Sequence, residues 1–287
     1  MLRVPTGHEI LVTTDFTLEG IHFRREWHSP EIVGHRCLTR GLSDIAAMGG
    51  KPTAAFLSLA LPRGLPEGWA QRFTKGLLAL ATQFSVTLAG GDTAESSGGI
   101  LADIVVVGSV PRGTAVLRAG AQPGDRIYVT GTLGGSSAAL AQLRAGRKVR
   151  SAEFPHHFRP VPRVAVGRFL REKGLASAMI DVSDGLSTDV AHICEESRVG
   201  AEILAPTIPR ARVGKKGSFV DEYHVLHGGE DYELLFTAPK NKPVPGRVAG
   251  VEISPIGRVT RKKELVLVTD RGERQKLEPQ GWEHFRR

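Results

Sequence analysis

The chain has 287 residues, of which 41% are hydrophobic and 24% charged, as in a folded globular protein large enough for two domains. No apolar run approaches the roughly 18 residues of a membrane span, and the first residues lack the pattern of a signal peptide. The net charge of +8 comes from scattered basic residues, and aromatic residues make up only 6%, so the sequence lacks the basic, aromatic-rich stripe of a nucleic-acid binder. We therefore expect no membrane and no nucleic-acid partner.

Apolar runs predict buried strands, and apolar residues that recur every three or four positions between these runs predict helices. The predicted strands cover residues 10–15, 55–61, 86–89, 104–108, 126–130 and 178–180. The predicted helices cover residues 30–45, 67–84, 134–145, 162–173 and 187–197. This alternation of strands and helices indicates the α/β class.

Turn-forming residues cluster at Pro111-Arg112-Gly113 and again over residues 120–125. We place a domain boundary there, with an N-terminal domain over residues 1–112 and a C-terminal domain over residues 113–287. The two cysteines, Cys37 and Cys194, form no CxxC pair and no disulfide framework, which predicts a reducing, cytoplasmic location.

Acidic residues recur beside the predicted strands. They are Asp15, Asp92, Asp181, Asp184 and Glu230. The ends of strands are where α/β proteins collect ligands. Two carboxylates about 4 Å apart, at an effective dielectric of about 20, repel by about 4 kcal/mol, so such a cluster requires protons or cations. Oxygen ligands without Cys or His favour Mg²⁺, which commonly completes its shell with substrate phosphates. The pattern therefore predicts a magnesium site that binds a phosphate-bearing substrate.

Each motif also has a structural explanation when it is taken alone. Asp184 could cap a turn, and Asp44, one helical turn after Arg40, could form a surface ion pair. Residues 131–137 fit a plain strand-to-helix turn as well as a phosphate cradle, and Trp282 could be a packing anchor. The sequence has neither a GxxxxGK[ST] phosphate loop nor a GxGxxG fingerprint.

Taken together, these motifs resemble the thiamine-monophosphate kinase family, part of the aminoimidazole-ribonucleotide-synthetase superfamily of ATP-using enzymes. The matching segments, in an order and spacing that fit nearly the whole chain, are residues 13–15, 19–23, 41–49, 89–93, 181–186 and 228–234. The resemblance implies two α/β domains and a homodimer built through the N-terminal domains. It also implies a reaction in which ATP and thiamine monophosphate give ADP and thiamine diphosphate by direct in-line transfer.

The resemblance further implies roles for single residues. The expected magnesium ligands are Thr13, Thr14, Asp15, Asp44, Asp92, Asp181 and Asp184. The expected ATP contacts are Gly91, Asp92, Arg118 and Ser183. The expected contacts to thiamine monophosphate are His22, Glu230 and Trp282. Among these, the residues expected to act directly in phosphoryl transfer are Asp44, Asp92, Arg118 and Asp184.

The sequence departs from the family in one feature. Family members carry a Gly-Asp-Asp segment ahead of the first strand, and the residues before Thr13 contain none. Two alternatives therefore stay open, namely another ATP-using enzyme of the superfamily and a catalytically impaired nucleotide-binding protein. The phrase Glu19-Gly20 with His22 favours the thiamine enzyme.

Overall fold

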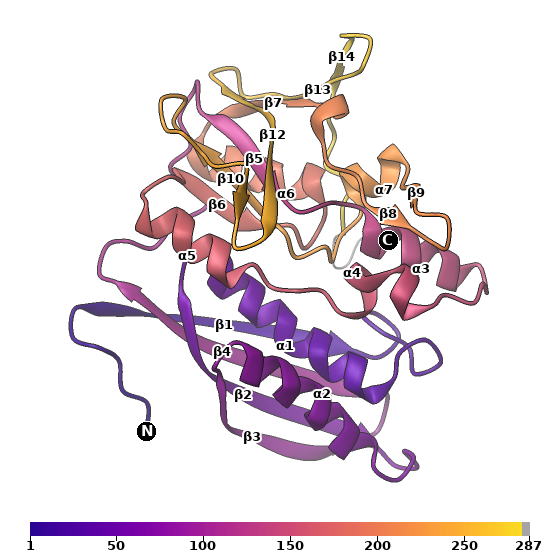
Figure 1. Cartoon of the computed structure of the whole chain (residues 1–287). Helices are drawn as coiled ribbons and strands as arrows, with labels where there is room; N and C mark the ends of the chain where they lie inside the picture. Colours follow the sequence, from indigo (N-terminus) through magenta and orange to yellow (C-terminus); the bar gives the residue numbers. More distant parts are fainter. Residues whose placement is uncertain (283–287) are drawn as a thin grey trace.

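The computed structural model describes residues 1–282 and contains two α/β units, which confirms the predicted fold class (Figure 1). The N-terminal unit is a four-stranded sheet in the order β1-β4-β2-β3, in which only β2 and β3 run parallel. Its strands are β1 (His8–Leu18), β2 (Lys51–Pro62), β3 (Thr87–Ser96) and β4 (Leu101–Pro111).

One face of this sheet is covered by helices α1 (Pro30–Ala47) and α2 (Trp69–Gln83). Helix α1 begins with a proline in its first turn, which suits the start of a helix because the missing N–H would have no intrahelical acceptor. Its apolar side chains pack with the buried residues of the sheet and of α2, and include Val33, Cys37, Leu38, Leu42 and Ile45. The opposite face of the sheet carries no helix of the same unit.

The C-terminal unit is an eight-stranded sheet in the order β14-β13-β7-β12-β5-β10-β6, with β11 paired to β12. Its strands are β5 (Arg126–Thr130), β6 (Ala178–Asp181), β7 (Gly200–Leu204), β10 (Leu234–Ala238), β11 (Arg247–Val248), β12 (Val251–Thr260), β13 (Leu265–Val268) and β14 (Arg274–Lys276). A separate hairpin joins β8 (Arg212–Val213) and β9 (Ser218–Phe219). The helices are α3 (Gly135–Arg144), α4 (Pro155–Phe158), α5 (Val164–Glu172), α6 (Leu186–Ser197) and α7 (Glu222–His227). No helix in this described part is long and apolar enough to cross a membrane.

The predicted strands and helices are all present, and most of what the sequence pattern missed is short. The four-residue helix α4, the six-residue helix α7 and the two-residue strands β8, β9 and β11 are too brief to show a hydrophobic period. Strand β3 is longer than predicted, because it continues through two glycines to Ser96. Gly91 has a positive φ of 152°, and a Cβ there would lie 1.8 Å from the carbonyl oxygen of Leu57 on β2. Glycine is thus needed for close approach of two strands.

Helix α1 also joins the two units, since it lies between the N-terminal sheet and the C-terminal unit (Figure 1). Ala46 and Ala47 of α1 belong to an apolar cluster with Val166 and Leu170 of α5. The two helices cross closely, since there is no room for a side chain on Gly167 of α5. A Cβ there would lie 2.0 Å from the carbonyl oxygen of Ala46. Small residues at this crossing therefore fix the distance between the units.

Replacing Gly167 by valine should force α5 away from α1. Inserting methyl groups into a packed contact costs about 1–3 kcal/mol, so we expect the free energy of unfolding of Gly167→Val to fall by that amount in urea titration. Gly246→Val is the matched control, because a Cβ at Gly246 meets nothing within 4 Å. Equal stability of the two variants would show that this crossing is not tightly packed.

Candidate functional site

A cavity of about 600 Å³ lies between the two units. The N-terminal unit contributes side chains from β1, from the loop after it and from α1. The C-terminal unit contributes α3, α7, the loop after β6, the loop before β10 and residues 280–282. Residues from six separate stretches of the chain thus meet at one place.

Helix α1 turns a polar stripe toward the C-terminal unit. Arg36, Arg40 and Asp44 are spaced four residues apart, which places their side chains on one face of the helix. Ser43, next to Asp44, donates a hydrogen bond of 2.6 Å to Oδ2 of Asp181 at the end of β6. Asp44 is not paired with Arg40, so the simple surface ion pair considered from the sequence is wrong.

One end of the cavity gathers carboxylates. Thr13 and Asp15 lie on the helix-covered face of β1, and Thr13 Oγ1 donates a hydrogen bond to Oδ2 of Asp44. Asp181 is buried, with 3% of its surface exposed, and Asp184 follows it in the loop to α6. These side chains all line the cavity except that of Thr13, which reaches it through Asp44.

Burial raises the pKa of the Asp44 carboxyl, and the charge of Asp15 adds to this, while Arg118 and Arg40 act in the opposite direction. Burial and the neighbouring Asp44 raise the pKa of Asp181 to about 7. These buried carboxyl groups are therefore costly to ionise unless a cation is added beside them. A cluster of carboxylate and hydroxyl oxygens of this kind fits Mg²⁺, which prefers hard oxygen ligands.

The loop after β6 is held by Asp189, which lies in the first turn of α6. Oδ2 of Asp189 accepts backbone N–H bonds from Asp184 at 3.3 Å and from Gly185 at 3.0 Å. Its Oδ1 is buried and has no hydrogen-bond partner among residues 1–282, and burial raises its pKa well above the usual value. Asp189 thus fixes the backbone that carries Ser183 and Asp184 into the cavity.

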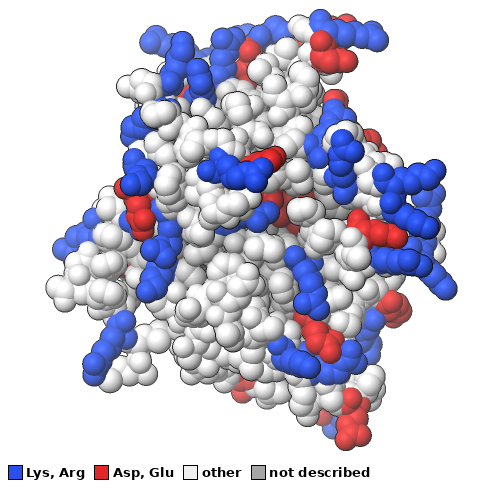
Figure 2. Space-filling model, viewed as in Figure 1, with Lys and Arg blue, Asp and Glu red and all other residues white. Residues whose placement is uncertain are grey.

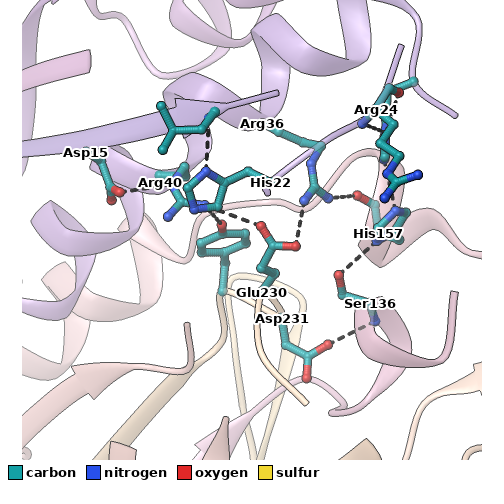
Figure 3. A network of polar contacts seen from close by, with 12 residues as sticks. Asp15, His22, Arg24, Arg36, Arg40, Ser136, His157, Glu230 and Asp231 are labelled. Carbon is teal, nitrogen blue, oxygen red and sulfur yellow. Dashed lines mark hydrogen bonds and ion pairs between the residues drawn. The ribbon is translucent and has the colours of Figure 1, made fainter. Parts of the chain in front are cut away.

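The other end of the cavity centres on Glu230 (Figure 3). Its carboxylate pairs with Arg36 at 2.7 Å and with Arg40 at 3.3 Å. Burial alone would raise the pKa of Glu230, but the two guanidinium groups hold it at about 2. Its own loop is close-packed, since a Cβ on Gly229 would meet the carbonyl oxygen of Ser183 at 2.4 Å. Glu230 is therefore a fixed, ionised group.

His22 and Trp282 lie in the same cavity on opposite units. Nδ1 of His22 accepts the backbone N–H of Leu18 at 3.0 Å, which fixes the ring relative to β1. The backbone N–H of Trp282 donates to the carbonyl oxygen of Asp184 at 3.0 Å, so the indole stands beside the loop after β6. Apolar and aromatic side chains also line the cavity, among them Ile21, Leu140 and Tyr223.

Besides Thr13, four expected site residues do not line the cavity, namely Thr14, Gly91, Asp92 and the exposed Arg118. Thr14, Gly91 and Asp92 are exposed, and Thr14 and Asp92 lie on the open face of the N-terminal sheet. Thr14 donates a 2.7 Å hydrogen bond to Asp103 on β4. Asp103 is paired across the sheet with Ser58 on β2, and Ser58 is paired with Asp92 on β3. The expectation that Asp15 and Asp92 stand at strand ends is wrong, because both lie within long strands of a mainly antiparallel sheet.

Residues 131–137 form a strand-to-helix turn in which the N–H groups of Gly131, Leu133, Gly134 and Ser136 already have protein acceptors. Asp231 accepts the backbone N–H of Gly134 at 2.7 Å and that of Ser136 at 3.2 Å. Burial raises the pKa of Asp231 to about 7, and these two bonds oppose the rise. The structure thus favours the plain turn over a phosphate cradle.

Several residues in or beside the cavity were missed in the sequence. Arg36 and Arg40 could have been found from their spacing with Asp44, which repeats every four residues. Tyr223, His224 and His227 could not, because α7 has only six residues and lies far in sequence from the other motifs. Their position depends on tertiary packing against α3 and α6, where His224 and His227 contact the hydroxyls of Ser137 and Ser187.

Cation binding to the carboxylates should depend on pH. Because the pKa of Asp181 is raised from 3.8 to about 7, its contribution to folding stability is complete at low pH and is lost as the pH rises through about 7. Mg²⁺ needs the ionised groups, so it should stabilise the protein at about pH 8 and much less at about pH 5.5. Differential scanning fluorimetry with and without MgCl₂ measures this as a shift in Tm.

The Asp44→Asn variant is the control, since it removes one carboxylate while keeping the side-chain shape. It should lose most of the magnesium-dependent shift at the higher pH. An equal shift at both pH values, or a full shift in the variant, would contradict cation binding at this cluster.

Comparison with known proteins identifies both units. Residues 1–110 match the model of the AIR synthase related protein, N-terminal domain, and residues 122–270 match that of the C-terminal domain. The thiamine-monophosphate kinase of Escherichia coli (strain K12) is 36% identical to this chain over 99% of the chain and 89% of that protein.

Solved structures give the same result. The structure described as AaThiL complexed with AMPPCP and TMP has a TM-score of 0.87 and 33% identity, over 99% of this chain and 89% of that one. Hydrogenase maturation protein HypE in complex with ATP has a TM-score of 0.78 at 17% identity, over 97% of this chain and 87% of that one, which shows a shared fold alone. Sequence identity above 30% to a named kinase over nearly the whole chain is stronger evidence than a shared fold. On this evidence the chain belongs to the thiamine-monophosphate kinase family.

Proposed function

We propose that this chain transfers the γ-phosphoryl group of ATP to the phosphate of thiamine monophosphate, giving ADP and thiamine diphosphate. The observation that carries the proposal is that one cavity between the two units combines clustered carboxylates with apolar and aromatic side chains. Acidic side chains from both units line this cavity around Asp15, Asp44, Asp181 and Asp184, and Ile21, Leu140, Tyr223 and Trp282 add apolar and aromatic surface to it. Such a cavity suits an acceptor with an aromatic part and a phosphate, beside a second set of phosphates.

Magnesium is proposed at the acidic end, where the buried oxygen ligands and their raised pKa values fit a hard divalent cation. The proposed ligands there are Thr13, Asp15, Asp44, Asp181 and Asp184, and Thr14 and Asp92 are proposed ligands on the open face of the N-terminal sheet. When bound, magnesium ions neutralise phosphate charge and align the reacting groups.

The chain's own residues bind and orient the two substrates. Ser183 and Arg118 are proposed to contact ATP, and the charge of Arg118 is close enough to Asp44 to affect its pKa. His22, Glu230 and Trp282 are proposed on the acceptor side. The acceptor oxygen is already ionised at neutral pH, so no general base is required, and catalysis depends on positioning and charge compensation. Asp44, Asp92, Arg118 and Asp184 are the proposed catalytic residues.

We further propose that the N-terminal domain ends at residue 112. We also propose that a homodimer forms through the open face of the sheet of this domain. Along β1 this face exposes Ile10, Val12 and Phe16 by 54–64% of their surface, an apolar row that a second copy would cover. Thr14 and Asp92 lie on the same face, so dimerisation would enclose their oxygen atoms. Gly91 and Asp92 are proposed to contact ATP there.

A nucleic-acid partner is not proposed. Figure 2 shows lysine and arginine side chains scattered over the visible face, with acidic side chains among them. The cytoplasm is the proposed location, supported by Cys37 and Cys194, which are both buried and unpaired.

The purified chain should form thiamine diphosphate and ADP in equal amounts from ATP and thiamine monophosphate, with a requirement for Mg²⁺. The Asp44→Asn variant should lose activity by at least about a hundredfold, because a charge that organises the phosphates is removed. Chromatography of the products measures both. Tight ATP binding without turnover in the wild type would instead favour a non-catalytic nucleotide-binding protein.

The dimer can be tested separately by replacing Phe16 with glutamate. A charge on each copy in an apolar interface should convert the dimer into a 30.9 kDa monomer in sedimentation velocity. Glu67→Gln, a change in the loop before α2, is the control. A wild-type protein that sediments as a monomer would contradict the dimer proposal.

A further inference from the structure

We propose that Arg40 binds the phosphate group of the acceptor substrate, an inference that rests on the proposed function. Arg40 stands on the polar stripe of α1, one helical turn before Asp44. It lines the cavity together with Asp15, Asp44 and Glu230. This places a permanent positive charge between the acidic end and the acceptor end.

Three contacts hold the Arg40 guanidinium in place (Figure 3). Its Nε donates to Oδ1 of Asp15 at 2.9 Å. Its Nη1 donates to Oε1 of Glu230 at 3.3 Å and to the hydroxyl of Tyr232 at 3.2 Å. The side chain is 15% exposed and is therefore oriented by protein atoms before any ligand arrives.

The remaining amino group of Arg40 is available to a ligand. Nη2 has no hydrogen-bond partner among residues 1–282, and it is not one of the buried polar atoms that lack a partner in that range. An accessible, fixed N–H donor on a cation is well suited to a phosphate oxygen, because charge-assisted hydrogen bonds to phosphate are among the stronger polar contacts.

Arg36 provides the contrast on the same helix face. Its side chain is 4% exposed, Nη1 donates to the carbonyl oxygen of His157, and Nη2 donates to Glu230. Arg36 does not line the cavity. It compensates the charge of Glu230, so the group formed by Arg36, Arg40, Asp15 and Glu230 is neutral as a whole. A phosphate can therefore approach Arg40 without facing an uncompensated carboxylate.

The position of Arg40 also fits the geometry that the transfer requires. The acceptor phosphate must lie between its own organic part and the phosphates of ATP, which means at the junction of the two cavity ends. Arg40 contacts residues of both ends, Asp15 and Glu230. Arg144, which also lines the cavity, lies on α3 beside Leu140 and Ala141 and so is next to apolar side chains of that helix.

The test compares the binding of thiamine monophosphate with that of thiamine, which lacks the phosphate, by isothermal titration calorimetry without ATP. Arg40→Gln should weaken binding of the monophosphate by roughly 10-fold to 100-fold and leave thiamine binding within about threefold. Arg40→Lys should restore part of the loss, because it keeps the charge but loses the planar donor pattern. The KM for ATP should stay within about threefold.

Arg72→Gln is the matched control, since Arg72 is exposed on the N-terminal unit, where it pairs with Glu31, and this variant should bind both ligands as the wild type does. Equal losses for thiamine and its monophosphate in Arg40→Gln, or a phosphate-specific loss in Arg144→Gln instead, would overturn the assignment. If the wild type makes no thiamine diphosphate, the proposed function fails. If the wild type is active and Arg40→Gln is unchanged, only the Arg40 assignment fails.

Discussion

The ion pairs that Arg36 and Arg40 make with Glu230 join the two units across the cavity. Charges buried in this way cost several kcal/mol each unless they are paired with good geometry, and removal of one partner typically costs about 3–5 kcal/mol. The pairing therefore restricts how α1 can sit against the loop before β10. Because Asp44 is on the same face of α1, its position relative to Asp181 and Asp184 follows from the same contact.

The cavity has two electrostatic environments as a result. Around Glu230 each carboxylate has an arginine partner, and the lowered pKa of Glu230 shows how strongly its charge is compensated. Around Asp44 and Asp181, burial and neighbouring carboxylates raise the pKa values of both groups. A protein that brings two phosphate groups together needs added cations at the place of transfer and a neutral, shaped surface for the rest of the acceptor. This division of charge supplies both conditions.

Sequence reasoning could predict those features that have a local pattern. The long amphipathic helix α1 and the apolar strands have clear periods, and short acidic motifs such as Asp181 to Asp184 mark the loop after β6. The side of a sheet on which a residue lies depends on the register of its neighbours, so the separation of Asp15 from Asp92 was not visible in the sequence. Arg40 illustrates the same limit. Its expected partner was its helical neighbour Asp44, whereas its actual partners Asp15 and Glu230 are 25 and 190 residues away.

Direct transfer between two bound phosphates can be measured with ATP that carries a radioactive label in its γ-phosphate. The chain would be incubated with this ATP, thiamine monophosphate and Mg²⁺, and the label would be followed by chromatography and by precipitation of the protein. Direct transfer predicts that the label enters the terminal phosphate of thiamine diphosphate, mole for mole with ADP, and never becomes attached to the protein. Label released as inorganic phosphate in the presence of the acceptor, or trapped on the protein, would contradict it.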